Sequence, residues 1–122
     1  MTPTELKFFA RLVVALPSTV VAPQVTMSAL VDIAEQQKRG KYKHVNMAKI
    51  STQRLDFVLF DKANGKVACV IELDDHTHDS VEQRDKDAER DAILTNSGYK
   101  VLRFDARRMP VVDELPRLLS VR

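Results

Sequence analysis

The chain lacks most of the features that would place it outside the ordinary globular classes. It has one cysteine, Cys69, so no disulfide can form within the chain, and we expect this residue to be a small part of the core. No apolar stretch approaches the roughly 20 residues that cross a bilayer. The first residues, 1–5, lack the basic and apolar regions of a secretory signal. We therefore expect a cytoplasmic protein whose present segment makes no membrane contact.

Internal repeats, low-complexity tracts and interdomain linkers are also absent from the sequence. Its 122 residues are 44% hydrophobic and 30% charged, a composition typical of one soluble globular domain with a core of its own. We therefore treat residues 1–122 as a single domain. The length leaves open that this domain was cut from a longer protein.

The net charge of +2 is too small to indicate a class of partner, but basic residues gather in two places. These residues are Lys38, Arg39, Lys41, Lys43 and Lys49, followed later by Lys100, Arg103, Arg107 and Arg108. Such clusters can contact phosphates, although surface lysines without a partner are commoner. Both interpretations remain open.

Capping residues and apolar periodicity predict the helices. Thr2 and Glu5 form a capping box for a first helix, which Pro17 ends. A second long helix is predicted for residues 80–97, because a serine and a glutamine have capping-box spacing at its start and a glycine follows its end. Shorter helical segments are expected at 28–37, 45–50 and 112–119.

Strands are predicted at 20–27, 54–60, 67–74 and 99–104. The turn Ala63-Asn64-Gly65 joins the second and third strands as a hairpin, and Pro23 indicates that the first lies at an edge. A crossover through the long helix makes the last two strands parallel, whereas the first three should be antiparallel. The predicted fold class is α/β, with a mixed four-stranded sheet flanked by helices.

Acidic residues converge at one end of the predicted hairpin. If its loop has three residues, pairing about Asn64 puts Asp56 opposite Glu72, and Asp74 follows on the same face. Opposed like charges destabilise a sheet, and carboxylates among so many apolar residues lose hydration. An oxygen-preferring divalent cation would remove both costs. The pattern therefore predicts a metal site formed by these three acids.

Each of these residues also has a simpler explanation. Asp56 could pair with an arginine such as Arg103, and Asp74 could bond to backbone amides of the following turn.

His76 and His78 come directly after the acids. They could be loop residues without a role, or one of them could act as a general base or orient water. Histidines beside carboxylates also admit zinc or manganese.

Three residues of the second long helix, Gln83, Asp87 and Arg90, share one face of the cylinder. If this face looks towards the acids, Arg90 would balance their charge and meet a scissile phosphate. Asp87 and Arg90 could instead be a solvated pair. Glu5 is explained by its capping box, although a glutamate there could also reach a metal through a water molecule.

Four segments carry a resemblance to a known family. They are Leu55-Asp-Phe-Val-Leu-Phe-Asp61, Val70-Ile-Glu-Leu-Asp-Asp-His-Thr-His78, the residues 84–91, and Gly98-Tyr-Lys-Val-Leu-Arg-Phe104. Together they resemble a bacterial domain of unknown function related to the very-short-patch-repair endonucleases. That domain belongs to the PD-(D/E)XK, or restriction-endonuclease-like, superfamily. The resemblance implies an αβββαβ core and magnesium as the cofactor.

Under this resemblance, Asp56 and Glu72 match the two acidic ligands and His78 matches the histidine that closes the motif. Asp87 and Arg90 match the acidic and basic positions of the following helix. The implied activity is hydrolysis of phosphodiester bonds in DNA, with Mg²⁺ or Mn²⁺.

One departure from the superfamily pattern is serious. Asp74 stands where the superfamily has a lysine that positions water and stabilises charge, so the cation would have to come from Arg90 or Lys86. Lys86 and Arg103 are the residues expected to contact nucleic acid. The alternative hypothesis is therefore a catalytically inactive nuclease fold that binds nucleic acid or a protein.

Overall fold

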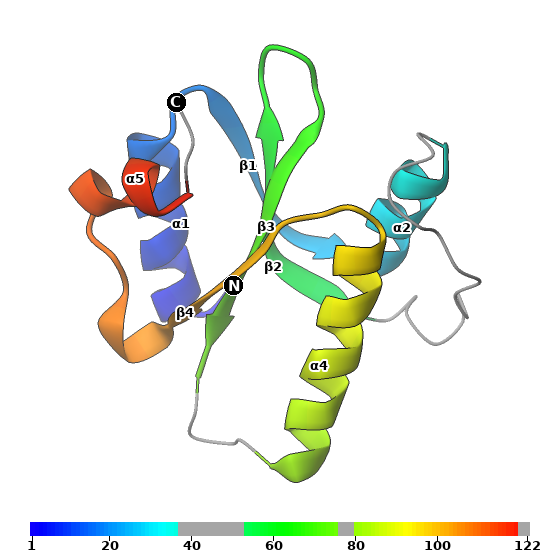
Figure 1. Ribbon diagram of the computed structural model, residues 1–122. Helices are drawn as coiled ribbons and strands as arrows, with labels where there is room; N and C mark the ends of the chain where they lie inside the picture. Colours follow the sequence, from blue (N-terminus) through cyan, green and yellow to red (C-terminus); the bar gives the residue numbers. More distant parts are fainter. Residues whose placement is uncertain (37–52, 76–79, 120–122) are drawn as a thin grey trace.

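The computed structural model describes residues 1–36, 53–75 and 80–119. The predicted helical turn at 45–50 and the histidines His76 and His78 lie outside these residues. The elements, in chain order, are α1 (Pro3–Ala15), β1 (Thr19–Thr26), α2 (Met27–Gln36), β2 (Arg54–Asp61), β3 (Val67–Asp74), α4 (Val81–Asn96), β4 (Val101–Asp105), the short 3₁₀ turns η2 (Ala106–Arg108) and η3 (Val112–Glu114), and α5 (Leu115–Leu119) (Figure 1).

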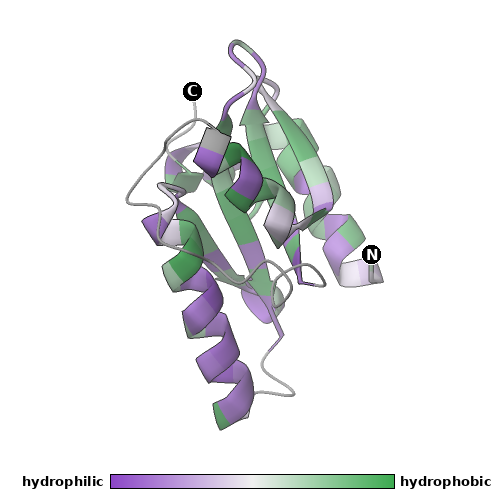
Figure 2. Ribbon diagram, turned by 90° about the vertical axis from the view of Figure 1, so that its right-hand side faces the viewer, coloured by the Kyte–Doolittle hydropathy of each residue, from purple (hydrophilic) through white to green (hydrophobic). Residues whose placement is uncertain are grey.

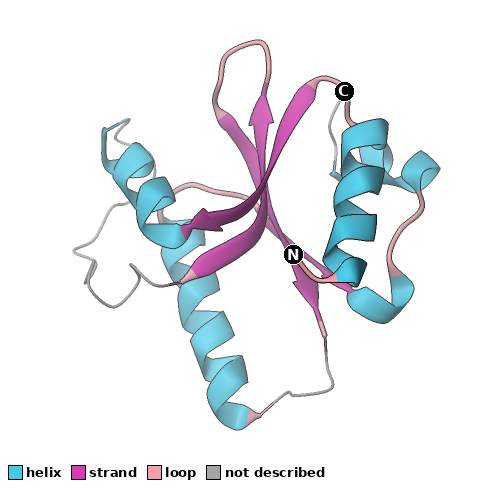
Figure 3. Ribbon diagram, turned by 180° about the vertical axis from the view of Figure 1, so that it is seen from behind, coloured by secondary structure: helices cyan, strands magenta, loops and turns pink. Residues whose placement is uncertain are grey.

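The four strands form one sheet in the order β1-β2-β3-β4. The pairs β1–β2 and β2–β3 are antiparallel and β3–β4 is parallel, which confirms the predicted mixed sheet. Helices cover both faces: α1 and α5 lie on one side, and α2 and α4 on the other (Figures 1 and 3). Pro23 lies in the edge strand β1, as expected, beside Gln24 with a φ of 53°.

Each face of the sheet has its own apolar core. On the side of α1 and α5, Phe8 packs edge-on against Phe57 with ring centroids 5.8 Å apart. On the other side, Val58, Val70 and Leu94 belong to a second cluster. Leu94 is the buried residue of α4, and the rest of that helix is mostly hydrophilic (Figure 2). The sheet face beneath α4 is therefore apolar near Leu94. Polar side chains can be accommodated under the other end of the helix.

The predicted helix boundaries are confirmed to within a few residues, and the capping residues explain them. Thr2 and Glu5 form the capping box that begins α1. Ser80 begins α4 by accepting a hydrogen bond from the backbone N–H of Gln83 at 3.0 Å. Gly98 follows the end of that helix with a φ of 88°, a conformation that favours glycine.

The hairpin between β2 and β3 has a longer turn than predicted. Residues 62–65 form the loop, since Asp61 N–H donates to Lys66 O at 2.7 Å, so the loop has one residue more than expected. Ala68 is the extra residue of a β-bulge, because its two neighbours pair with consecutive residues of β2. The bulge absorbs the additional loop residue, and pairing beyond it is centred on Asn64 as predicted.

Within the described ranges, no helix is both long and apolar enough to cross a membrane.

Candidate functional site

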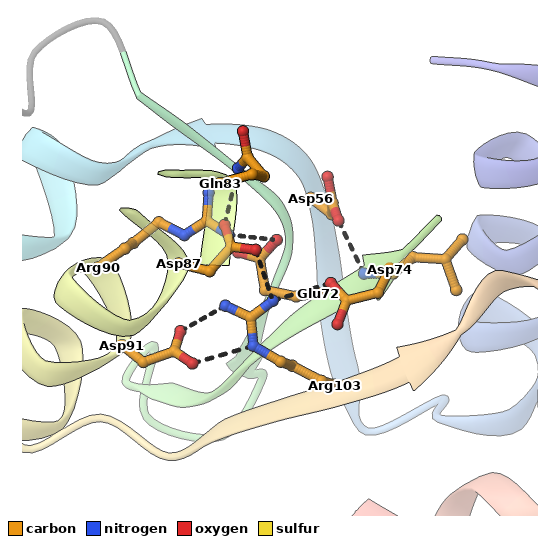
Figure 4. A network of polar contacts seen from close by, with 9 residues as sticks. Asp56, Glu72, Asp74, Gln83, Asp87, Arg90, Asp91 and Arg103 are labelled. Carbon is orange, nitrogen blue, oxygen red and sulfur yellow. Dashed lines mark hydrogen bonds and ion pairs between the residues drawn. The ribbon is translucent and has the colours of Figure 1, made fainter. Parts of the chain in front are cut away.

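A polar cleft of about 270 Å³ opens where the ends of β2 and β3 face the first turns of α4 (Figure 4). Its lining residues are Asp56, Glu72, Leu73, Asp74, Asp75, Gln83, Asp87 and Arg90. All three acids of the predicted metal site and all three residues of the predicted helix face are among them. The structure thus confirms that this helix face looks towards the acids.

Asp56 lies near the start of β2, beside Glu72 of β3. Phe57 pairs with Ile71, and continuing this register by one residue places Asp56 opposite Glu72. The Asp56 carboxylate accepts a hydrogen bond from the backbone N–H of Leu73 at 2.8 Å, so it is fixed at the mouth of the hairpin. Burial raises the pKa of Asp56, and the Leu73 hydrogen bond opposes that rise.

Glu72 is the most deeply buried charged residue of the cleft, with only 3% of its surface exposed. Its Oε2 lies 3.7 Å from Arg90 Nη2, whereas its Oε1 has no hydrogen-bond partner among the residues that the structure describes. Burial, followed by the negative charge of Asp56, raises the pKa of Glu72 to about 8. A carboxyl group in this position is therefore largely protonated at neutral pH.

Asp56 and Glu72 act as a pair that holds one proton. Burial and then the negative charge of Asp56 raise the pKa of Glu72, so the proton of the pair is held by Glu72. Two adjacent carboxylates cannot both ionise cheaply away from water. The pair is the kind of site at which a cation can replace a proton.

Asp74 has a different partner. Its Oδ1 accepts a hydrogen bond from Arg103 Nη1 at 2.8 Å. The same guanidinium donates from Nε and Nη2 to the two oxygens of Asp91, at 2.9 and 2.8 Å. These hydrogen bonds to Asp91 raise the pKa of Arg103. Arg103 therefore joins Asp74 of β3 to Asp91 of α4, as Figure 4 shows.

The α4 side of the cleft is a chain of polar contacts. Gln83 Nε2 donates to Asp87 Oδ1 at 3.0 Å, and Arg90 Nη2 donates to the same oxygen at 3.1 Å. Arg90 thus bridges Asp87 and Glu72, with its positive charge beside these two acids. Its Nε is buried and has no hydrogen-bond partner in the described part of the chain.

The comparisons with known proteins identify the family. Residues 1–120 match DUF2726, which is described as a protein of unknown function. The chain belongs to this family. No curated protein and no solved structure matches it. The match covers every residue of the cleft, so the whole site lies within the DUF2726 domain.

The three predicted metal ligands have different surroundings in the DUF2726 structure. Across residues 1–36, 53–75 and 80–119, no three His, Cys, Asp or Glu side chains are grouped so that they could hold a metal ion. Asp74 differs from Asp56 and Glu72 because its carboxylate is held by Arg103, and the three-acid metal site stays a prediction. The simpler explanation proposed for Asp56, an arginine partner, applies to Asp74 instead.

Other predicted site residues are placed as follows. Glu5 accepts a hydrogen bond from Thr2 N–H at 3.1 Å in its capping box, and its negative charge contributes to the raised pKa of Asp56. Lys86 is exposed on α4. His78 lies outside the described residues, and its role stays a prediction. Contact of Lys86 or Arg103 with nucleic acid also stays a prediction.

Asp91 was missed by the sequence analysis. A signal was present, since Asp87 and Asp91 are spaced by one helical turn and so lie on one face of α4. Nothing in the sequence, however, indicated that Arg103 of β4 reaches under that helix.

Proposed function

We propose that Asp56 and Glu72 bind a divalent metal ion, Mg²⁺ or Mn²⁺, and that the protein is a nuclease hydrolysing phosphodiester bonds in DNA. One observation carries the proposal. The nearly inaccessible side chain of Glu72 has an oxygen without a hydrogen-bond partner among the described residues, and it lies beside a second buried carboxylate in an open cleft. A buried carboxylate that lacks a hydrogen-bond donor or a counter-ion is costly. A bound cation would supply the missing positive charge.

The charge balance of the cleft supports a divalent ion. The contacts link five carboxylates and two guanidinium groups into one network. They belong to Asp56, Glu72, Asp74, Asp87, Asp91, Arg90 and Arg103. With every group ionised the network has three excess negative charges, and the proton on Glu72 reduces this excess to two. A divalent cation that displaced this proton would leave an excess of only one negative charge.

The donor chemistry also suits these metals. Carboxylate oxygens are preferred ligands of Mg²⁺ and Mn²⁺, and Mg²⁺ sites often use only one or two carboxylates together with water and substrate phosphate. Asp56 and Glu72 would hold the ion. When bound, such an ion supplies Lewis-acid stabilisation of phosphoryl charge and activation of water.

The remaining residues have defined tasks in this proposal. Arg90 offers a positive charge at the wall of the cleft, where it would offset negative charge that develops on a scissile phosphate. Asp87 and Gln83 hold that guanidinium in place through the hydrogen bonds of α4. Exposed Lys86, on the same helix, would attract the nucleic-acid backbone.

The proposed relation to the PD-(D/E)XK superfamily is consistent with the order of elements. A helix, three strands, a helix and a strand occur in the order that the resemblance implies, with α2 between the first two strands. Asp56 and Glu72 stand on the two strands where the superfamily's acidic ligands are expected. These points support the relation.

A second candidate function is a module that binds nucleic acid or a protein without cleaving anything. The position of Asp74 favours it, because an aspartate bound to Arg103 occupies the place of the superfamily's lysine. This candidate predicts binding that weakens steeply with salt, without turnover.

A cleavage assay separates the two candidates. Duplex and single-stranded DNA would be incubated with the protein in Mg²⁺, in Mn²⁺ and in chelator. We expect cleavage with either metal, loss of cleavage in the isosteric variants Asp56→Asn and Glu72→Gln, and no change in Asp85→Asn. Asp85 is a matched control because it is exposed on α4 and does not line the cleft. Absence of cleavage with both metals, together with salt-sensitive DNA binding, would favour the second candidate.

A further inference from the structure

We propose that Arg103 is a specificity-determining residue: by holding Asp74 away from the Asp56–Glu72 pair, it makes the site prefer Mg²⁺ to the larger Ca²⁺. The inference rests on the proposed metal binding at that pair. It goes further, because it assigns Asp74 and Arg103 to the choice of ion and removes Asp74 from the ligands.

The register of the sheet explains why Arg103 is in this position. In the parallel pair β3–β4, Arg103 is the partner of Glu72, so its side chain starts beside the most buried acid of the cleft. The guanidinium then extends under α4. Its charge acts on Glu72 as well, since it opposes the rise in the pKa of that residue.

The contacts of Arg103 hold it tightly. Two parallel hydrogen bonds to Asp91 form a fork, and the third donor, Nη1, reaches Asp74 at 2.8 Å and lies 3.9 Å from Asp87 Oδ2. Charge-assisted forks of this kind fix geometry as well as charge. A lysine has one ammonium group and could not make the same set of bonds. Arg103 is thus anchored on α4 while it holds the carboxylate from β3.

The consequence for metal binding follows from ligand number. Mg²⁺ requires six ligands in near-ideal octahedral geometry and keeps several waters, whereas Ca²⁺ accepts six to eight oxygen ligands in flexible arrangements. Asp74 lines the same cleft as Asp56 and Glu72, so its carboxylate becomes available if Arg103 is removed. A third carboxylate would benefit Ca²⁺ more than Mg²⁺.

The preference between the two ions separates this effect from a simple change of charge. Loss of the positive charge of Arg103 would strengthen the binding of both divalent ions by a similar factor. A gain that is larger for Ca²⁺ requires a new ligand. The ratio of the two dissociation constants is therefore the quantity to measure.

The experiment is a calorimetric titration of the full chain with Mg²⁺ and with Ca²⁺, for the wild type and for variants at residues 74 and 103. In Arg103→Met, the preference for Ca²⁺ should increase about tenfold, because ligand number and charge set such affinities. Arg103→Lys should show a smaller increase. Adding Asp74→Asn to Arg103→Met should restore the wild-type ratio.

Asp74→Asn alone keeps the proposal falsifiable if Arg103→Met does not fold. This variant should leave the dissociation constant of Mg²⁺ within about threefold of the wild-type value, since a ligand that is not used contributes little. A tenfold weakening of Mg²⁺ in Asp74→Asn would overturn the inference, as would an unchanged ratio in a folded Arg103→Met.

Failure of the proposed metal binding and failure of the role of Arg103 give different results. If the wild type binds neither ion, or if Asp56→Asn leaves binding unchanged, metal binding at the Asp56–Glu72 pair is wrong, and the inference falls with it. If the wild type binds Mg²⁺ through Asp56 and the ratio does not respond to Arg103, only the inference fails.

Discussion

Asp56 and Glu72 lie opposite each other at the open end of the β2–β3 hairpin, and burial raises the pKa of both. Burial, together with the negative charge of Asp56, keeps a proton on Glu72 at neutral pH. A sheet gains nothing from two opposed acids. Their placement is explained if the proton is exchanged for a metal ion.

Without metal, stability should decrease as pH rises. The pKa of Glu72 is about 8 in the folded protein against an ordinary 4.5, so the folded state binds the proton more tightly than the unfolded state does. The stabilisation is complete below about pH 4.5 and is lost as pH rises through about 8.

Glu72→Gln should remove this contribution, and the variant should exceed the wild type by about 1–3 kcal/mol in free energy of unfolding at pH 9. Denaturant unfolding of both proteins from pH 4 to pH 9 measures the difference. A difference that does not change with pH would contradict the assigned pKa.

Arg90→Met should destabilise the folded protein by about 1–3 kcal/mol at neutral pH, because it leaves Asp87 and Glu72 without their half-buried cation. The variant should also lose DNA cleavage even when Mg²⁺ is saturating, since the proposed contact between Arg90 and the phosphate would be lost. Thermal melts and cleavage rates test these effects separately. Normal cleavage in a folded Arg90→Met protein would show that Arg90 is structural only.

Thr2→Ala and Glu5→Gln separate the helix cap from the charge near the site. Thr2→Ala removes a capping side chain and should cost about 1 kcal/mol in free energy of unfolding, with no effect on metal affinity. Glu5→Gln retains an oxygen that can accept from Thr2 N–H, so α1 should be preserved.

The loss of the Glu5 charge should nevertheless lower the pKa of Asp56. Carboxyl titration by NMR would follow this change. An unchanged Asp56 titration in Glu5→Gln would mean that Glu5 acts only as a cap.

Much of the fold could be predicted because local signals agree with it. The capping box of Thr2 and Glu5 and the stop at Gly98 specify helix ends by short-range chemistry. The hairpin register was also predictable, although for an incomplete reason. The loop is longer than assumed, and only the bulge at Ala68 restores pairing about Asn64.

The candidate site was less predictable, because its decisive contacts join elements far apart in the sequence. Strand spacing alone indicated that Asp56 and Glu72 would meet. It could not indicate that Arg103 would reach both Asp74 and Asp91, since that depends on the position of α4 over β4. Periodicity in the sequence shows which face of an element a side chain occupies. Prediction of a bidentate contact requires the three-dimensional arrangement of the elements.

The most direct test of the central claim is the number of protons released when the metal binds. Calorimetric titration with Mg²⁺ or Mn²⁺ in buffers of different ionisation enthalpy gives this number. Because the pKa of Glu72 is about 8, we expect release of about one proton per ion at pH 7, close to none above pH 9, and no binding in Asp56→Asn. Binding without proton release at pH 7, or binding that survives in Asp56→Asn, would contradict the account.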